Sequence, residues 1–157
     1  MALHMGTELP SLEGATQWLN GGPLHRQELT GKPTLIHFWA VSCHLCKETM
    51  PTVNRWRDTY QPLGLQVIAV HMPRSQEDTA TEAVQEAIQR YQLTQPVAID
   101  NQHAVKRAFA NEFVPAFYLF DAQGYLRHFQ AGDRGLRMVE RRIRRLLDLP
   151  EEDATEG

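Results

Sequence analysis

Cysteine is scarce in this chain of 157 residues, which contains only two, Cys43 and Cys46. A domain of this length buries a sizeable core without disulfide staples, so both cysteines are free for chemistry. Long apolar runs are also missing, and no segment approaches the ~20 residues that a membrane-spanning helix needs. The start lacks the basic and apolar regions of an export signal. We therefore expect a cytoplasmic protein if the sequence is full length, and an extracytoplasmic one if an export signal was trimmed.

No charge of one sign dominates, since 16 Lys and Arg stand against 19 Asp and Glu, giving a formal net charge of −3. This balance gives no electrostatic reason to expect a nucleic acid or an anionic membrane as a partner. Local exceptions are an arginine-rich stretch from Arg127 to Arg145 and an acidic tail over residues 150–157. Such runs usually only solvate a helix face or a chain end, so we expect the tail to be flexible.

Chain length and hydrophobic periodicity predict one domain over residues 1–157. The predicted strands are 34–39, 65–71, 97–99, 116–120 and 125–130, and the predicted helices are 46–60, 78–91, 105–109 and 136–147. The turn signal at residues 20–23 also predicts a hairpin between 16–19 and 24–29. Strands that alternate with helices early, followed by a late hairpin, predict an α/β fold with a mixed sheet covered by helices on both faces.

The two cysteines lie where a predicted strand gives way to a predicted helix, in the run from Phe38 to Cys46. Two intervening residues leave one helical turn between the sulfurs. The thiols can therefore close a small disulfide ring, or present one exposed thiolate with a second thiol behind it. Pro51 lies inside the helix and removes one backbone donor, which predicts a kink. The spacing is that of a reversible redox switch.

These features together resemble the thioredoxin fold. The shared pattern is the strand ending Phe38-Trp39-Ala40, then Cys43-x-x-Cys46 opening a helix with Pro51 five residues on, and Val114-Pro115 at the place of that fold's cis-proline. The helix over 78–91 and the strand over 97–99 resemble the helix–strand insertion of the TlpA/ResA type of thioredoxin-like thiol-disulfide oxidoreductases. The resemblance covers roughly residues 16 to 148, the scope of one domain.

The resemblance assigns Cys43 as the attacking nucleophile, because it comes first in the motif and lies at the helix N-terminus. Unpaired backbone N–H groups and the helix dipole stabilise a thiolate there. Cys46 would be the more buried resolving thiol. His44 and Leu45 occupy the positions that tune the redox potential. A cationic His44 would favour the thiolate and make the disulfide more oxidising, whereas an exposed, weakly coupled histidine would have little effect.

His37 stands where thioredoxins often place a buried acid behind the resolving cysteine. A neutral imidazole could accept or relay that thiol's proton, or it could be a core histidine bound to a backbone carbonyl. Val114 and Pro115 are the expected substrate contacts, because a cis bond there leaves backbone beside the cysteines free to pair with an extended segment. Trp39 is the third residue expected at the substrate-binding site, where it would pack near the motif and take no part in the chemistry.

Three positions depart from the pattern of that subfamily. Leu45 replaces the proline that commonly precedes the second cysteine. Thr49 stands where a glutamate is often found, and Glu48 is one place off and would point elsewhere on the helix. The resemblance therefore defines the reaction better than the redox potential or the pathway.

We predict a monomeric thiol-disulfide oxidoreductase with no cofactor beyond its own Cys43–Cys46 disulfide. Its partners would be protein disulfides or dithiols and an upstream thiol reductant. One alternative is a copper(I) or zinc metallochaperone using Cys43, Cys46 and a nearby histidine such as His71. A single C-x-x-C supplies only two of the usual four zinc ligands, so we expect no metal site. A redox-inert thioredoxin-like binding module is the other alternative.

Overall fold

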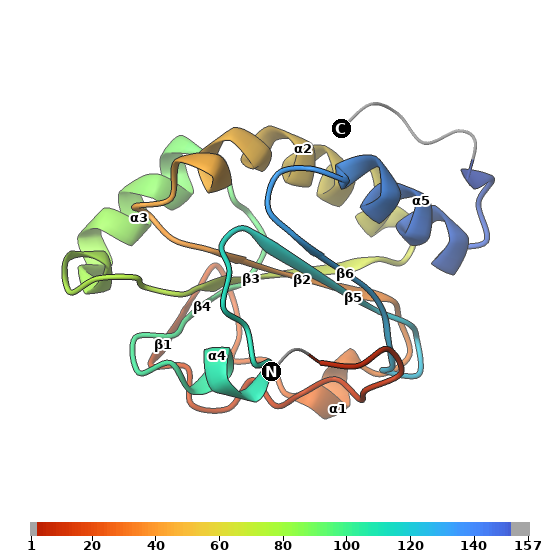
Figure 1. Ribbon diagram of the computed structural model, residues 1–157, viewed down its shortest axis with the longest axis horizontal. Coiled ribbons are helices and arrows are strands. Elements are labelled where there is room, and N and C mark those ends of the chain that lie inside the picture. Colours follow the sequence, from red (N-terminus) through yellow and green to blue (C-terminus); the bar gives the residue numbers. More distant parts are fainter. Residues whose placement is uncertain (1–2, 152–157) are drawn as a thin grey trace.

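The computed structural model describes residues 3–151 and contains one six-stranded mixed sheet (Figure 1). The strand order is β1-β4-β3-β2-β5-β6. The strands are β1 (Gln17–Leu19), β2 (Thr34–Trp39), β3 (Gln66–His71), β4 (Val97–Ile99), β5 (Ala116–Phe120) and β6 (Leu126–Ala131). The helices are α1 (Arg26–Leu29), α2 (His44–Tyr60), α3 (Thr81–Arg90), α4 (Ala104–Ala108) and α5 (Leu136–Leu146), with 3-10 turns η1 (Gln61–Leu63) and η2 (Glu77–Thr79).

Strands β2, β3 and β4 run parallel to one another, whereas β1, β5 and β6 pair antiparallel with their neighbours. Helices α2, α3 and α5 cover one face of the sheet, and α1 and α4 lie against the other (Figure 1). The predicted α/β architecture, with a mixed sheet between two layers of helices, is confirmed. The predicted strand at 97–99 and the helix before it are also present, as β4 and α3.

The central strand β2 supplies side chains to both layers, and all six of its residues are buried. Because side chains alternate along a strand, Leu35 packs with the helices α2 and α5, while Ile36 and Phe38 pack on the opposite face with Phe109. Burying one such large apolar side chain contributes roughly 1.5–3 kcal/mol to folding. The end of β2 is therefore a rigid platform for the residues that follow it.

Helix α2 follows the predicted apolar spacing, with Met50, Val53, Trp56 and Tyr60 all buried. Its N-cap is Cys43, whose sulfur accepts a hydrogen bond from the Cys46 N–H. A 17-residue helix that starts at the motif directs its unpaired N–H groups toward the sulfurs. The position of the cysteines in the fold is thus set by the strand-to-helix junction.

The predicted N-terminal hairpin is wrong. Strand β1 pairs antiparallel with β4 instead of with residues 24–29, and those residues contain helix α1. The Asn20 amide donates to the carbonyls of Leu93 and Gln95, which ties the turn to the segment leading into β4. The Glu28 carboxylate accepts from the N–H of His25 and caps α1. Tertiary pairing and a local cap therefore override the turn signal.

In residues 3–151 no helix combines the length and the apolar character needed to cross a membrane. The acidic tail lies largely outside the described residues. Of its acidic residues the structure describes Glu151, whose carboxylate accepts from the Arg145 guanidinium at 2.8 Å.

Candidate active site

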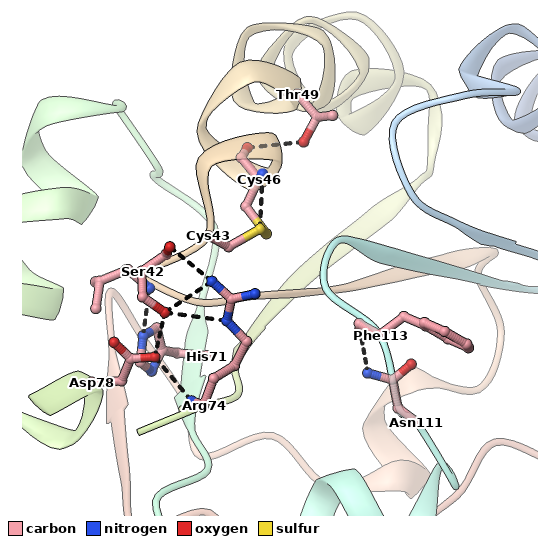
Figure 2. Close-up of a disulfide and its surroundings, with 10 residues drawn as sticks. Ser42, Cys43, Cys46, Thr49, His71, Arg74, Asp78, Asn111 and Phe113 are labelled. Carbon is pink, nitrogen blue, oxygen red and sulfur yellow. Dashed lines mark hydrogen bonds between the residues drawn. A yellow bond between two sulfur atoms is a disulfide. The ribbon is translucent and has the colours of Figure 1, made fainter. Parts of the chain in front are cut away.

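The two cysteines form a disulfide in the first turn of helix α2, with their Cα atoms 5.3 Å apart (Figure 2). The Cys46 N–H donates to the Cys43 Sγ over 3.0 Å. Cys43 is 3% exposed and Cys46 is fully buried. The buried Thr49 hydroxyl donates to the Cys46 carbonyl at 2.9 Å, within the same turn. Cys43 is thus the outer sulfur, and it occupies the position where a backbone donor and the helix terminus stabilise negative charge.

Ser42, directly before the outer cysteine, is tethered to the loop that follows β3. The Ser42 hydroxyl donates to the Asp78 carboxylate at 2.7 Å, and the Arg74 guanidinium donates to the Ser42 carbonyl at 2.7 Å (Figure 2). Asp78 is 2% exposed and also accepts from the Arg74 backbone N–H. Asp78 thus holds Ser42 and the Arg74 backbone together beside the redox motif.

His71 holds Val41, the residue before Ser42, in place. Its Nε2 accepts from the Val41 N–H at 3.1 Å, so the ring proton lies on Nδ1. The ring is completely buried, and burial lowers the pKa of His71 to about 4, although the Asp78 carboxylate acts to raise it. Trp39, 1% exposed, meets the His71 ring edge-on at 4.8 Å between centroids. Trp39 therefore packs beneath the motif, away from the surface that a substrate would meet.

The Val114–Pro115 peptide is cis and follows a segment held by the buried Asn111. The Asn111 amide donates to the Phe113 carbonyl at 2.7 Å, and its oxygen accepts from the Tyr118 hydroxyl at 2.8 Å. Val114 packs against the apolar cluster that contains Cys43 and Cys46. The structure thus brings the predicted substrate-contact segment to the cysteines.

His37 lies within β2 on the face that helix α2 covers, and it is 2% exposed. Its Nε2 meets the Gln95 Nε2 at 2.9 Å, and the Gln95 oxygen accepts from the Arg57 guanidinium. Since that oxygen faces Arg57, the amide NH2 of Gln95 faces His37 and donates to it. Burial, with a smaller contribution from Arg57, lowers the pKa of His37 to about 3. The imidazole is neutral, and a side-chain amide satisfies it instead of a backbone carbonyl.

The two residues between the cysteines face solvent. The His44 side chain is 83% exposed and its Nε2 lies 3.6 Å from the Glu48 carboxylate, while Leu45 is 40% exposed. Glu48 therefore points away from Thr49 and the disulfide, as expected from its position on the helix.

A metal site is not assembled in the part of the chain that the structure describes. Within residues 3–151 no group of three or more His, Cys, Asp and Glu side chains is arranged to hold an ion. Nε2 of His71 is already engaged by Val41. The ligand set proposed for a metallochaperone is not brought together.

Four residues around the motif escaped the sequence analysis: Ser42, Arg74, Asp78 and Asn111. Their partners lie far away in the sequence or depend on the loop geometry, as with Ser42 and Asp78, which are 36 positions apart. The one usable signal was the polar Pro73-Arg74-Ser75 segment at the end of an apolar strand, where functional loops of α/β sheets lie.

Comparison with known proteins shows the family to which the chain belongs. A family model described as AhpC/TSA matches residues 5–129. The chain belongs to the AhpC/TSA family. Thiol-disulfide oxidoreductase YkuV of Bacillus subtilis (strain 168) is 52% identical over 139 residues, which cover 88% of this chain and 93% of that protein. Thiol-disulfide oxidoreductase ResA of Bacillus cereus is 27% identical over 122 residues, covering 78% of this chain and 66% of ResA.

A solved structure agrees with these relatives. The solution structure of a thioredoxin-like protein in the oxidized form is 49% identical, covers 93% of this chain and 98% of its own, and superposes with a TM-score of 0.84. The predicted thioredoxin fold and the resemblance to the TlpA/ResA type are confirmed. The protein is a thioredoxin-like thiol-disulfide oxidoreductase of the AhpC/TSA family, with a C-x-x-C disulfide at the start of α2.

Proposed function

We propose that this protein reduces disulfides in partner proteins, with Cys43 as the nucleophile and Cys46 as the resolving thiol. The observation that carries this assignment is the asymmetry of the pair. Cys43 caps α2, accepts the Cys46 N–H and is the outer sulfur, whereas Cys46 is fully buried one turn inside. The thiolate is the reactive form, so the sulfur at the helix terminus is the better attacking group.

The reaction balances in two exchanges. The Cys43 thiolate attacks one sulfur of a partner disulfide, and the other partner sulfur leaves as a thiolate. Cys46, after losing its proton, then attacks Cys43 in the mixed disulfide and releases the partner's second thiol. The products are a reduced partner and the oxidised protein seen in this structure. An upstream thiol reductant must restore the dithiol before the next cycle.

The substrate segment would lie along Val114. No hydrogen bond within residues 3–151 uses the backbone N–H or carbonyl of Val114, which is half-buried beside the cysteines. An extended partner segment can pair with these two groups, as in strand addition. Val114 and Pro115 thus form the proposed backbone contact, while Trp39 supports the motif from below.

His37 is proposed as the group that handles the Cys46 proton. It is a neutral imidazole on the face of β2 that α2 covers, and because its pKa is about 3 the role proposed is to pass the proton on and not to keep it. Substituting His37→Ala should slow the resolving step and leave the first attack by Cys43 largely unchanged. Equal rates for the second step in the two proteins would assign the histidine a packing role only.

The cysteine assignments are tested by trapping. The Cys46→Ser variant, incubated with a disulfide-containing protein, should accumulate a mixed disulfide at Cys43, visible by mass spectrometry and reversed by a small thiol. The matched control, Cys43→Ser, should accumulate little or none. Comparable trapping by both variants, or trapping only by Cys43→Ser, would overturn the assigned roles.

A further inference from the structure

An open groove of about 450 Å³ lies beside the disulfide, between the loop after β3 and the loop before β5. Arg74 and Phe113 both line it, with Arg74 next to Ser42 and Cys43 and Phe113 well separated from Arg74 (Figure 2). We call it the Arg74–Phe113 groove. The lining residues that matter here are Met72, Pro73, Arg74, Lys106, Phe113 and Val114.

One rim of the groove is apolar and exposed. Phe113 is 55% exposed, although large aromatic side chains are usually buried, and Val114 next to it packs against the cysteine cluster. Asn111 holds the Phe113 carbonyl, so the segment that carries the exposed ring is fixed. Beneath them, Met72 and Pro73 are buried. This rim can receive an apolar side chain from a partner.

The other side of the groove is cationic. Arg74 is held beside the motif by its hydrogen bonds to the Ser42 hydroxyl and carbonyl. Lys106 lies in α4, whose first turn is fixed by the Asp100 carboxylate through the N–H groups of Val105 and Lys106. Across the described part of the chain, no carboxylate lies within ion-pair distance of the Arg74 guanidinium or the Lys106 ammonium.

The groove also contains one acid, Glu112, which is exposed on the rim beside Phe113. His103 lines it too, but its Nε2 is bound to the Pro73 carbonyl at 2.9 Å. Among the side chains that line the groove, two cations, Arg74 and Lys106, stand against one acid, in a chain whose formal net charge is −3. The carboxylates of Asp78 and Asp100 lie behind these cations, where both are buried and accept from backbone N–H groups. The charge that a substrate would meet on the lining of the groove is therefore positive.

We propose that the Arg74–Phe113 groove selects partner-protein segments that carry an acidic side chain close to the reactive cysteine, with an apolar side chain placed on Phe113. The inference rests on the proposed function and names its substrate class. A carboxylate accepts from Arg74 and attracts Lys106, while the segment backbone pairs with Val114. Complementary charge at the edge of a site raises the association rate and the specificity more than the final affinity.

The test uses peptides with a single cysteine held as a mixed disulfide with 2-mercaptoethanol. Reduced protein converts each peptide to the free peptide thiol and free 2-mercaptoethanol, and is itself oxidised. The peptides are made in matched pairs that differ by Glu or Gln at one position. That position is one of the two residues before or the two residues after the cysteine, and a Leu is placed on the other side of the cysteine. Because the total number of thiols does not change, second-order rate constants are measured from the conversion of the peptide mixed disulfide to the free peptide, with the two separated by chromatography.

With the wild-type protein, we expect the best Glu peptide to react about fivefold faster than its Gln counterpart at low salt, the size expected for exposed charge pairs. The ratio should fall toward one in about 0.5 M salt, where exposed charges are screened. The Lys106→Gln variant should reduce the ratio about twofold, and Arg74→Gln combined with Lys106→Gln should abolish it. Rates with the Gln peptides should stay within about twofold of wild type for Lys106→Gln.

Two control variants distinguish the effect of a lost charge from the effect of a changed structure. Arg107→Gln removes an exposed cation of α4 that does not line the groove, and it should leave the Glu/Gln ratio unchanged. Arg74→Lys keeps the charge and should retain most of the preference even if the hydrogen bonds to Ser42 are lost. Equal rates for Glu and Gln peptides at every position, or a ratio that survives the double substitution, would overturn the proposal. If no peptide is reduced at all, the proposed function itself fails.

Discussion

The two ends of helix α2 are built differently. At the N-terminal end the polar contacts hold backbone and sulfur in place, through the Cys46 N–H, Ser42 and His71, and the residues between the cysteines are exposed. Toward the C-terminal end the polar contacts converge on one buried carboxylate, that of Glu140. Arg55 donates two hydrogen bonds to the Glu140 carboxylate, at 3.1 and 3.2 Å, and Tyr60 donates a third at 2.5 Å.

This contrast indicates that the N-terminal end of α2 determines reactivity and that its C-terminal end contributes to stability. Glu140 is 1% exposed, so its charge needs its partners on α2, and those contacts lock α5 against the helix. The disulfide end has no such buried ion pair in the described residues, and Cys43, at 3% exposed, is the less buried of the two cysteines. Changes at one end should alter unfolding, and changes at the other should alter exchange.

The largest expected effect is on stability, at the C-terminal end of α2. Arg55→Ala leaves the Glu140 carboxylate buried without its two guanidinium hydrogen bonds, and should lower the free energy of unfolding by about 3 kcal/mol. Arg55→Lys keeps the charge but loses the two-pronged geometry, and should cost less. Urea denaturation measures both. The disulfide-exchange rate of the folded variants should match wild type, and a large loss of that rate would contradict the separation of the two ends.

The next effect is a loss of stability in acid. The folded-state pKa of His37 is about 3, below the ordinary value near 6.5, so the unfolded chain binds the proton first. Stability from this residue is therefore complete above the unfolded-state pKa and is lost as the pH falls toward about 3. Between about pH 7 and about pH 5 the loss is about 2 kcal/mol.

His37→Gln keeps an acceptor for Gln95 and removes the proton-binding site. Between about pH 7 and about pH 5, its free energy of unfolding should therefore fall by about 2 kcal/mol less than that of the wild type. Urea titrations at the two pH values measure the difference. His71, with a pKa of about 4, should contribute a similar term that the substitution leaves in place. An unchanged acid dependence in His37→Gln would show that burial does not lower the pKa of this histidine in the folded state.

A smaller loss is expected at the disulfide end, in the loop that carries the cis-proline. Asn111→Ala removes the donor to the Phe113 carbonyl and the acceptor for Tyr118, at a cost of about 1–2 kcal/mol. It should also slow exchange with peptide disulfides more than with a small disulfide, because the substrate segment lies along this loop. Tyr118→Phe removes only one of these bonds and should leave the peptide rate unchanged. Equal slowing with both disulfides would show a general distortion of the site.

Much of the molecule was predictable because its signals are local. The apolar spacing of Met50, Val53 and Trp56 predicted α2, and the spacing of the cysteines predicted the redox pair. The N-terminal hairpin was mispredicted for the opposite reason. The turn at Asn20 is real, but the partner of β1 is β4, some 80 residues later, and no turn signal contains that information.

The contacts that position the disulfide were equally out of reach. Gln95 satisfies His37 across 58 residues, and Arg74 reaches Ser42 across 32. Such bonds depend on the order of strands in the sheet, which brings the ends of β2, β3 and β4 together. The sequence could therefore name the reactive sulfurs, while only the fold shows what holds them and what a substrate would meet beside them.

The smallest expected effect concerns His44. Its side chain is 83% exposed and Glu48 lies 3.6 Å away, so solvent and the carboxylate both weaken its field at Cys43. His44→Ala should change the unfolding free energy by less than about 0.5 kcal/mol. It should make the reduction potential more negative by less than about 30 mV, because a cation that favours the thiolate is lost. Glu48→Gln, which removes the screening carboxylate, should move the potential the other way, and shifts of the same sign in the two variants would rule out an electrostatic role for this pair.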